Sequence, residues 1–380
     1  MSLVVDEHRQ YLGDRARLRV FERAIAAAVR PGDVVIDLGA GTGVLGLLAC
    51  RAGAARVYAI ESGGMIEVAR ALAHANGLGD RVICVPSHSS EAQLPEHADV
   101  LVADLIGRMG FEAGAFEAYA DVRRWLKPDA RVIPESISIF AAPVQQDAAH
   151  ADVEFWSSPV AGFRTDPALD WSRNTGYPRA FDPSELLSDT PVSATFRPID
   201  ECAVLRINDG ARIARAGRLH GIAAWFSARM LAGDPSIVMT NAPGALDRIA
   251  RRNVFLPLHP VVDLAAGDCV EIDIRIRPRD GIVAWTAEVR TRGSVTRMRH
   301  STLGGMLLTR EDLKAQHPAS RPRLTRRGLA RRTLLELCDG DRSIADIERE
   351  LQRRHPDLFP SQAGAQAFVA EVVAGYGLVE

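Results

Sequence analysis

The chain has 380 residues, of which 47% are hydrophobic and 25% charged, and its formal net charge is −2. This length predicts two or three domains with sizeable cores, and the charge gives no general attraction to nucleic acid or membranes. The five cysteines are scattered without Cys-x-x-Cys spacing, which predicts free thiols, a reducing compartment and no metal site. No secretory signal or membrane-length apolar run is present, so we expect a cytoplasmic protein.

The most informative segment begins with a predicted buried strand at 34–38, followed by a glycine-rich turn and a helix. A second strand, 57–60, ends at the carboxylate Glu61. This order is typical of a doubly wound α/β domain that holds an adenosine-containing cofactor. Asp37 would repel a pyrophosphate but suits the ammonium of a methionine moiety, and Glu61 suits ribose hydroxyls. The pattern therefore favours S-adenosylmethionine over a dinucleotide, and the residues expected to bind it here are Asp37, Gly39, Gly41, Gly43 and Glu61.

Alternating strands and helices continue to about residue 140. Apolar residues at helical spacing predict helices over 44–51, 65–76 and 116–126, and apolar runs predict strands over 81–85, 99–104 and 131–133. Such alternation implies a mostly parallel sheet with helices on both faces. Ligands bind beyond the carboxyl ends of these strands, where Asp37, Glu61, the loop 87–91 and Asp104 are expected to converge.

Beyond residue 140 the pattern changes to short alternating runs separated by turn residues. This pattern predicts an antiparallel β region, either a barrel or a sandwich, that forms the other wall of the cleft. The runs are 193–197, 202–207, 221–228, 236–240, 270–276 and 282–289.

Over residues 5–290 the chain resembles the protein arginine methyltransferases. The segments that carry the resemblance are 14–17, 35–43, 52–61, 103–107 and 125–129, together with the β region. The resemblance implies a Rossmann-like cofactor domain followed by a β-barrel domain. It also implies that Arg17 binds the carboxylate of the cofactor, that Glu91 lies near its adenine, and that His8 lies near the active site. Ser90, next to Glu91, is also expected to bind the cofactor. By the same resemblance, the stretch 155–188 is a candidate dimerisation arm, so a homodimer is expected.

The acceptor side departs from that family, which holds a guanidinium between two glutamates of one loop. Asp104 stands at the first position, and Glu112 stands near the second on a loop one residue shorter. Arg248-Ile249-Ala250 replaces the family's Thr-His-Trp triplet, and its N-terminal pair of tyrosines is absent. We interpret this as a retained methyl-donor site and a rebuilt acceptor site, with Asp104 and Glu112 as the candidate catalytic residues that orient or deprotonate the acceptor.

The last 70 residues begin with a basic linker and predict three short helices, with Ser343 as an N-cap. They resemble the PqqD family, the winged-helix-like recognition elements that bind leader segments of ribosomally made precursor peptides. That family often binds its peptide as an added strand, to which 306–309 would contribute. A purely structural or dimerising module is one rival interpretation. A DNA-binding helix-turn-helix is another, but acidic residues on the helix 344–354 disfavour it.

These segments suggest three domains: a cofactor domain (1–140), a β-barrel substrate domain (141–310) and a peptide-binding domain (311–380). The leading hypothesis is a methyltransferase that modifies a ribosomal precursor peptide held by its C-terminal domain. Three alternatives stay open. They are a protein arginine N-methyltransferase, a small-molecule methyltransferase, and a regulator that binds nucleic acid or a partner with a relic methyltransferase fold.

Overall fold

The computed structural model describes residues 4–112, 114–291 and 294–376. It divides into two compact units at residues 306 and 307, and each unit has its own apolar core. All five cysteines carry free thiols. Among the described residues, no helix combines the length and apolarity that crossing a membrane requires.

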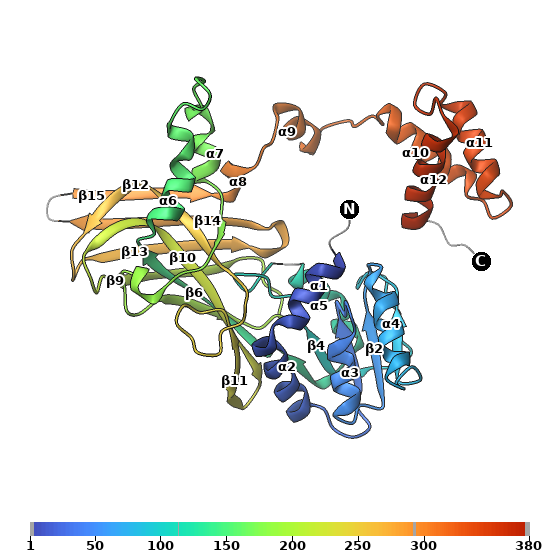
Figure 1. The fold of residues 1–380 in the computed structure, drawn as a ribbon, viewed down its shortest axis with the longest axis horizontal. Coiled ribbons are helices and arrows are strands. Elements are labelled where there is room, and N and C mark those ends of the chain that lie inside the picture. The colour runs from blue at the N-terminus through green and yellow to red at the C-terminus, as the bar shows by residue number, and fades with distance from the viewer. Residues whose placement is uncertain (1–3, 113, 292–293, 377–380) are drawn as a thin grey trace. The chain divides into compact units, whose positions relative to one another are not determined.

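A five-stranded parallel sheet organises the first part of the larger unit, as the sequence predicts (Figure 1). Its strand order is β3-β2-β1-β4-β5. Every residue of β1 is buried, because helices cover both faces of the sheet. The strands are β1 (Val34–Leu38), β2 (Arg56–Ile60), β3 (Val82–Val85), β4 (Ala98–Ala103) and β5 (Leu126–Ile133).

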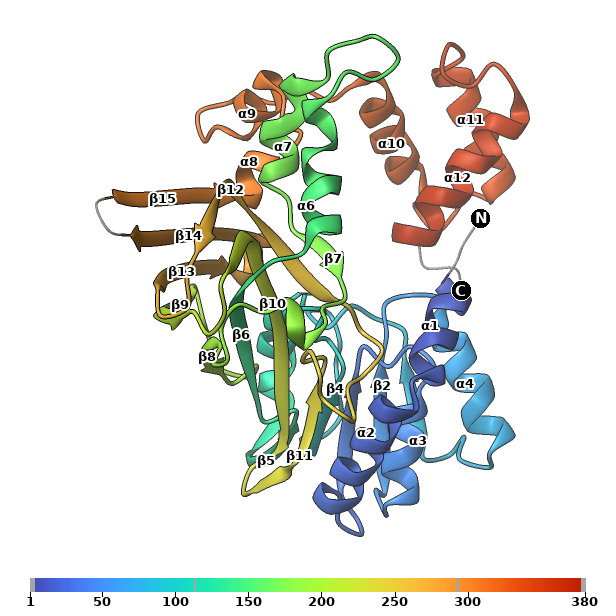
Figure 2. The same ribbon diagram turned by 60° about the vertical axis from the view of Figure 1, so that its left-hand side comes forward.

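Successive residues of the central strands face two different cores, as the two-residue repeat of a strand requires. Ile36 packs in the core that includes Phe116 and Tyr119, whereas Val35 packs in the core that includes Phe21 and Ile25. Figure 2 shows α2 and α3 side by side in front of the sheet. The helices are α1 (Val4–Gly13), α2 (Arg15–Ala28), α3 (Val44–Arg51), α4 (Met65–Ala75) and α5 (Ala115–Val122), with the short helix η1 (Arg123–Trp125) after α5.

Two antiparallel sheets form the second part of the larger unit, also as predicted. One has the order β7-β12-β10-β6-β8 with β11 paired to β10, and the other has the order β15-β14-β13-β9. Because β8 lies beside β9 and β12 beside β15, the sheets adjoin along both edges in a barrel-like arrangement. The strands are β6 (Ser136–Val144), β7 (Tyr177–Arg179), β8 (Val192–Phe196), β9 (Leu205–Arg212), β10 (Gly217–Leu231), β11 (Asp234–Thr240), β12 (Asn253–Leu264), β13 (Cys269–Arg277), β14 (Ile282–Thr291) and β15 (Ser294–Ser301).

Four of these strands, β6, β7, β12 and β15, lie outside the predicted runs. Strand β12 contains Pro257 and Pro260, which interrupt the usual strand pattern. Strand β15 is an edge strand rich in polar residues, and β6 is buried along almost its whole length and so shows no alternation.

The helices α6 (Asp147–Glu154) and α7 (Leu169–Arg173) extend away from the β-rich part in both ribbon views (Figures 1 and 2). Three short helices accompany them, at 155–157, 166–168 and 183–185. Arg173 pairs with Glu154 at 2.6 Å, and the Ser172 hydroxyl donates to the Val153 carbonyl at 2.9 Å. These contacts hold α6 against α7. Helix α7 and the three short helices lie within the stretch 155–188 expected to form the dimerisation arm, and α6 directly precedes it.

The smaller unit is helical. Its helices α10 (Arg326–Leu337), α11 (Ile344–Arg354) and α12 (Gln362–Tyr376) surround a core that includes Leu334, Leu351 and Phe368. Ser343 caps α11 by accepting from the Asp346 amide, as predicted. Before them the chain forms α8 (Thr302–Gly305) and α9 (Arg310–Gln316).

The expectation of a winged-helix-like domain needs correction. Residues 307–376 contain no strand, and 306–309 is not a strand either. The three predicted helices are present, but the described residues supply no wing and no strand edge. Capture of a peptide by strand addition therefore has no visible template in this unit.

Candidate functional site

The glycine-rich turn connects β1 to α3 and has the backbone that only glycine adopts easily. Gly39, Gly41 and Gly43 have φ values of 65°, 53° and 72°. A Cβ atom on Gly41 would also lie 2.4 Å from Cε1 of His8, and one on Gly39 would lie 2.9 Å from Leu105. Because these glycines have no Cβ, other groups can come close to the backbone of the turn. His8 of α1 already packs against it at Gly41.

Asp37, at the carboxyl end of β1, has one oxygen engaged and one unpaired. Its side-chain Oδ2 accepts from the Gly46 amide at 2.8 Å, while Oδ1 is buried without a hydrogen-bond partner among the described residues. Burial raises the pKa of Asp37 to about 7, although the Gly46 amide and the Arg17 guanidinium act to lower it. A buried unpaired carboxylate oxygen suits a cationic ligand such as an ammonium group.

Glu61 follows β2 and lies across the turn from Asp37. Its Oε2 accepts from the Gly41 amide at 3.0 Å, and its Oε1 accepts from the Gly63 amide at 2.7 Å. Each carboxylate oxygen has a second lone pair. Glu61 is therefore fixed beside the turn and keeps acceptor capacity for hydroxyl donors.

Ser90 and Glu91 lie in the loop after β3 and are exposed. The Ser90 hydroxyl is 2.8 Å from Nδ1 of His88, and the Ser90 carbonyl accepts from Arg124. The buried neighbour Ser89 donates to Asp121 at 2.6 Å, which anchors the loop. Cofactor binding by Ser90 and contact of Glu91 with the adenine stay predictions.

Asp104 lies at the carboxyl end of β4 and pairs with two arginines. Its Oδ2 accepts from Nε of Arg17 at 2.5 Å and from Nη2 of Arg251 at 3.1 Å. The three side chains are 8%, 10% and 14% exposed. Burial would raise the pKa of Asp104, but the guanidinium groups of Arg251 and Arg17 outweigh it and hold the pKa below its usual range. This geometry suits a fixed carboxylate that orients cations and makes Asp104 a poor proton acceptor.

Arg251 is a residue that sequence reasoning missed. Its Nη1 donates to the Gly107 carbonyl at 3.1 Å as well as to Asp104, and its guanidinium carbon lies 5.9 Å from the centre of the Tyr11 ring. The guanidinium carbon of Arg17 lies 5.8 Å from the same ring. Tyr11 thus supplies an aromatic surface beside the site.

Asn241 fixes the segment that carries Arg251 against the loop that follows Asp104. It is buried, and its Nδ2 donates to the carbonyls of Arg108 at 3.0 Å and Arg252 at 3.2 Å. Its Oδ1 accepts from the Phe226 amide, and Asn253 donates to its carbonyl. We call this set of contacts the Asn241 clasp.

Asp14 provides a second tie to that segment. One of its oxygens caps α2 by accepting from the Arg17 amide at 3.1 Å, and the other accepts from the Ala250 amide at 2.7 Å. A backbone amide at Ala250 therefore meets Asp14 where the resemblance places a histidine-containing triplet. The positions of both arginines follow from these contacts.

Glu112 points back into its own loop. Its Oε2 accepts from the amides of Met109 at 2.9 Å and Phe111 at 3.3 Å. Burial raises the pKa of Glu112, although these amides act to lower it. A Cβ atom on Gly107 would lie 2.4 Å from Oε2, so the carboxylate packs against the loop backbone. In this arrangement Glu112 shapes the loop, and a direct role toward an acceptor stays a prediction.

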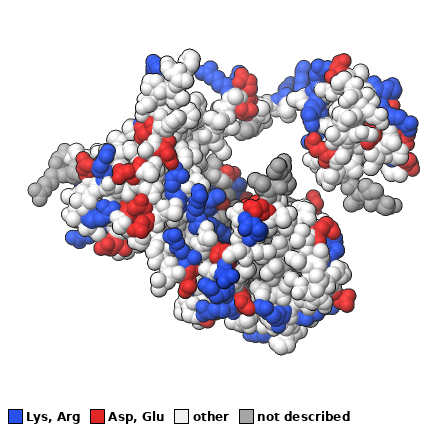
Figure 3. Space-filling view, viewed as in Figure 1, with Lys and Arg blue, Asp and Glu red and all other residues white. Residues whose placement is uncertain are grey.

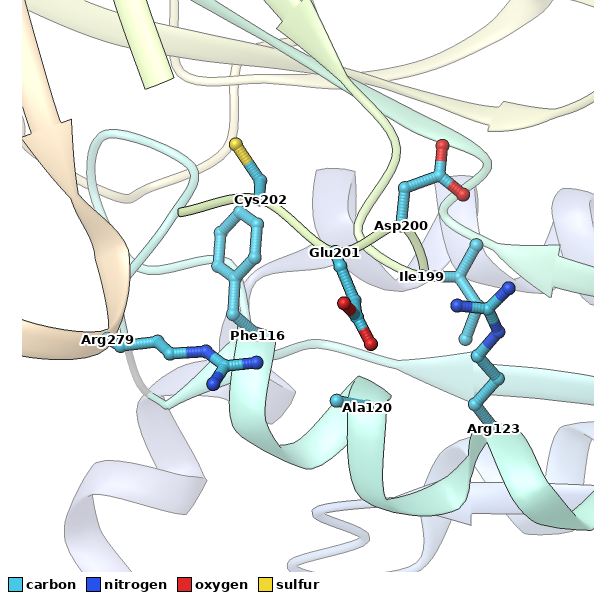
Figure 4. Close-up of a pocket in the computed structure, with 8 residues that line it drawn as sticks. All are labelled: Phe116, Ala120, Arg123, Ile199, Asp200, Glu201, Cys202 and Arg279. Atoms are coloured by element: carbon cyan, nitrogen blue, oxygen red, sulfur yellow. The ribbon is translucent and has the colours of Figure 1, made fainter. Parts of the chain in front are cut away.

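A separate small pocket lies between α5, the segment 199–202 and the short helix η5 (Pro278–Asp280), as Figure 4 shows. Phe116, Arg123, Glu201, Cys202 and Arg279 are among its lining residues. None of the candidate site residues lines it. The carboxyl ends of β1, β2 and β4 therefore remain the candidate active site.

Comparison with known proteins finds methyltransferases. Residues 18–133 match the family model of ribosomal protein L11 methyltransferase (PrmA). The histone-arginine methyltransferase CARMER of Culex quinquefasciatus is 27% identical over 253 residues, which cover 63% of this chain and 42% of that protein. CARMER of Drosophila persimilis is 32% identical over 158 residues, covering 40% of this chain and 30% of that protein. The chain thus spans less than half the length of these curated relatives.

Two solved structures share the fold. The Trypanosoma brucei PRMT1 enzyme-prozyme heterotetrameric complex with AdoHcy gives a TM-score of 0.69 at 17% identity, covering 77% of this chain and 97% of that chain. Protein arginine methyltransferase 10 of Arabidopsis thaliana gives 0.66 at 19% identity, covering 78% and 97%. The predicted order of a Rossmann-like domain followed by a β-rich domain is confirmed.

Proposed function

We propose that this chain is an S-adenosylmethionine-dependent methyltransferase that modifies a protein. The observation that carries the proposal is the buried, unpaired Oδ1 of Asp37 beside a glycine turn that admits close backbone approach. A pyrophosphate would meet like charge there, whereas the ammonium of a methionine moiety would pair with it. The matches to methyltransferases support the same reading.

The residues present fit that cofactor. Asp37 would hold its ammonium group and Glu61 its ribose hydroxyls. Arg17, whose Nε donates to Asp104, would bind its carboxylate through the rest of the guanidinium. His8 would cover the turn. When bound, S-adenosylmethionine supplies an activated methyl group, and the transfer needs positioning of the acceptor and removal of any excess proton.

Calorimetry with S-adenosylhomocysteine and with NAD tests this proposal. We expect the first ligand to bind and the second not to bind. Glu61→Gln should weaken binding at least tenfold, because a hydrogen bond to a charged group contributes about 1.5–3 kcal/mol. Asp80→Asn, at an exposed position away from the turn, serves as the control. Binding of NAD in place of S-adenosylhomocysteine would refute the proposal.

For the acceptor, the comparisons favour a protein arginine over a ribosomal precursor peptide, since the curated relatives are named histone-arginine methyltransferases. Incubation with labelled cofactor and a panel of peptides, followed by mass spectrometry, would identify the methylated residue. The precursor-peptide hypothesis stays a prediction. Loss of transfer on deleting a leader segment would support it.

We also propose a homodimer formed through the arm 155–188. Its support is the set of large apolar side chains exposed there: Phe155, Trp156, Val160, Phe163 and Trp171. The Trypanosoma brucei PRMT1 enzyme, which has a similar fold, forms a heterotetrameric complex with its prozyme. Light scattering of the chain and of a Phe163→Ser variant tests this expectation.

The C-terminal unit is proposed as a protein-binding module, with nucleic acid as the weaker alternative. Figure 3 shows acidic and basic side chains interspersed on its visible face. Arg326 pairs with Asp357, and Arg327 and Arg331 both pair with Glu371. Because these arginines already have acidic partners, they attract phosphate less strongly than the basic sequence suggests.

A further inference from the structure

The contacts of Arg251 suggest an inference that rests on the proposed methyl-transfer function and concerns its acceptor. The Arg251 guanidinium lies at the carboxyl end of β4, held by Asp104 and the Gly107 carbonyl beside the Tyr11 ring. Leu105, the next residue of that loop, packs against Gly39 of the glycine turn. A guanidinium of the chain itself therefore lies next to the candidate methyl-donor site.

We propose that Arg251 determines acceptor specificity by filling the place that an acceptor guanidinium would otherwise take. Asp104 is the buried carboxylate at this place, and both of its oxygens already accept from Arg251. The 14% exposure of the Arg251 side chain leaves little room for a second guanidinium on the same groups. In the wild-type site an acceptor arginine therefore reaches Asp104 only by displacing Arg251, and loss of Arg251 leaves this place free for it.

Several contacts keep Arg251 in this place. The Asn241 clasp joins the carbonyls of Arg108 and Arg252, the residues that follow Gly107 and Arg251. Asp14 accepts from the Ala250 amide. Five hydrogen bonds, four in the Asn241 clasp and one between Asp14 and Ala250, fix the backbone around Arg251. An incoming arginine would therefore have to displace a guanidinium that the fold itself positions. Arg17 also donates to Oδ2 of Asp104, and this bond should remain when Arg251 is removed.

Arg251→Ala is the central variant, and Arg252→Ala is its matched control, because the Arg252 side chain is exposed and the Asn241 clasp uses only the Arg252 carbonyl. Methyl transfer to a peptide with one arginine between glycines is followed by mass spectrometry. We expect kcat/KM for this peptide to rise at least tenfold in Arg251→Ala over the wild type, and to stay unchanged in Arg252→Ala. Equal arginine methylation by the wild type and Arg251→Ala, or methylation of Arg251 itself, would overturn the inference.

A second readout does not depend on methyl transfer. In Arg251→Ala, N-acetyl-arginine amide at millimolar concentration should refill the vacated place and raise the melting temperature, with no rise in the wild type or Arg252→Ala. If Arg251→Ala does not fold, Arg251→Gln replaces it in both assays. Absence of S-adenosylhomocysteine binding in every variant would refute the proposed function, whereas normal binding without either gain would refute the role of Arg251.

Discussion

At the scale of single residues, Asp37 shows how a binding group lowers stability before its ligand arrives. Only one of its oxygens is hydrogen-bonded, by the Gly46 amide, and the other is buried without a partner among the described residues. Burial of a charge is costly unless the charge is paired, and this cost raises the pKa of Asp37 to about 7. A cationic ligand would remove the cost, so part of the ligand's affinity comes from relieving it.

Replacement of this carboxylate should stabilise the free chain in a pH-dependent way. The pKa of Asp37 is raised from 3.8 to about 7, so the folded state holds a proton that the unfolded state has lost between these values. Wild-type stability therefore falls as pH rises from about 4 through about 7, by about 1.4 kcal/mol for each unit of pKa shift. Asp37→Asn should abolish this decline, which chemical denaturation at pH 4 to 8 would measure.

The same substitution separates stability from binding. Above pH 7, Asp37→Asn should melt at a higher temperature than the wild type and bind S-adenosylhomocysteine at least tenfold more weakly, because a charge-assisted bond is lost. Asp80→Asn should change neither property. An Asp37→Asn chain that is less stable than the wild type at pH 8 would contradict the assignment of a buried, unpaired charge.

At the scale of elements, the turn between β1 and α3 could be predicted because its information is local. Buried strand, glycines and carboxylate follow one another in sequence, and the structure brings Asp37, Gly41 and Glu61 together. The pairing of Arg251 with Asp104 could not be predicted, since the two lie 147 residues apart and the strand β12 that follows Arg251 contains prolines. Its position depends on the Asn241 clasp, which leaves no short-range pattern.

The glycine turn makes a prediction that separates backbone strain from crowding. Gly41→Ala introduces a Cβ 2.4 Å from the His8 ring at a φ of 53°, whereas Gly77→Ala has a similar φ of 67° with nothing within 4 Å. The left-handed conformation should cost each variant about 1–2 kcal/mol, and crowding against His8 should destabilise Gly41→Ala further. Only Gly41→Ala should also weaken S-adenosylhomocysteine binding, measured by calorimetry.

A double variant completes this test. His8→Ala combined with Gly41→Ala removes the crowding and keeps the strained backbone. Stability should then match that of Gly77→Ala. If Gly77→Ala weakens cofactor binding as much as Gly41→Ala does, the effect is general strain and His8 has no special place over the turn.

At the scale of the whole molecule, the chain consists of two units whose apolar cores are separate. The candidate cofactor residues, which run from His8 to Glu91, all lie in the larger unit. The C-terminal helices were predictable from their apolar spacing and the Ser343 cap. The absence of strands among residues 307–376 could not be predicted, because the resemblance that suggested a wing rests on a short helical stretch.

This separation predicts the effect of deleting residues 307–380. Because the larger unit contains its own core and every candidate cofactor residue, the truncated chain should bind S-adenosylhomocysteine with an unchanged Kd. If the smaller unit captures the protein substrate, its loss removes an effective concentration of about millimolar order. The KM for the full-length substrate should then rise strongly, while kcat and the KM for a short acceptor peptide stay the same. An unchanged KM for the full-length substrate would show that the C-terminal helices do not deliver it.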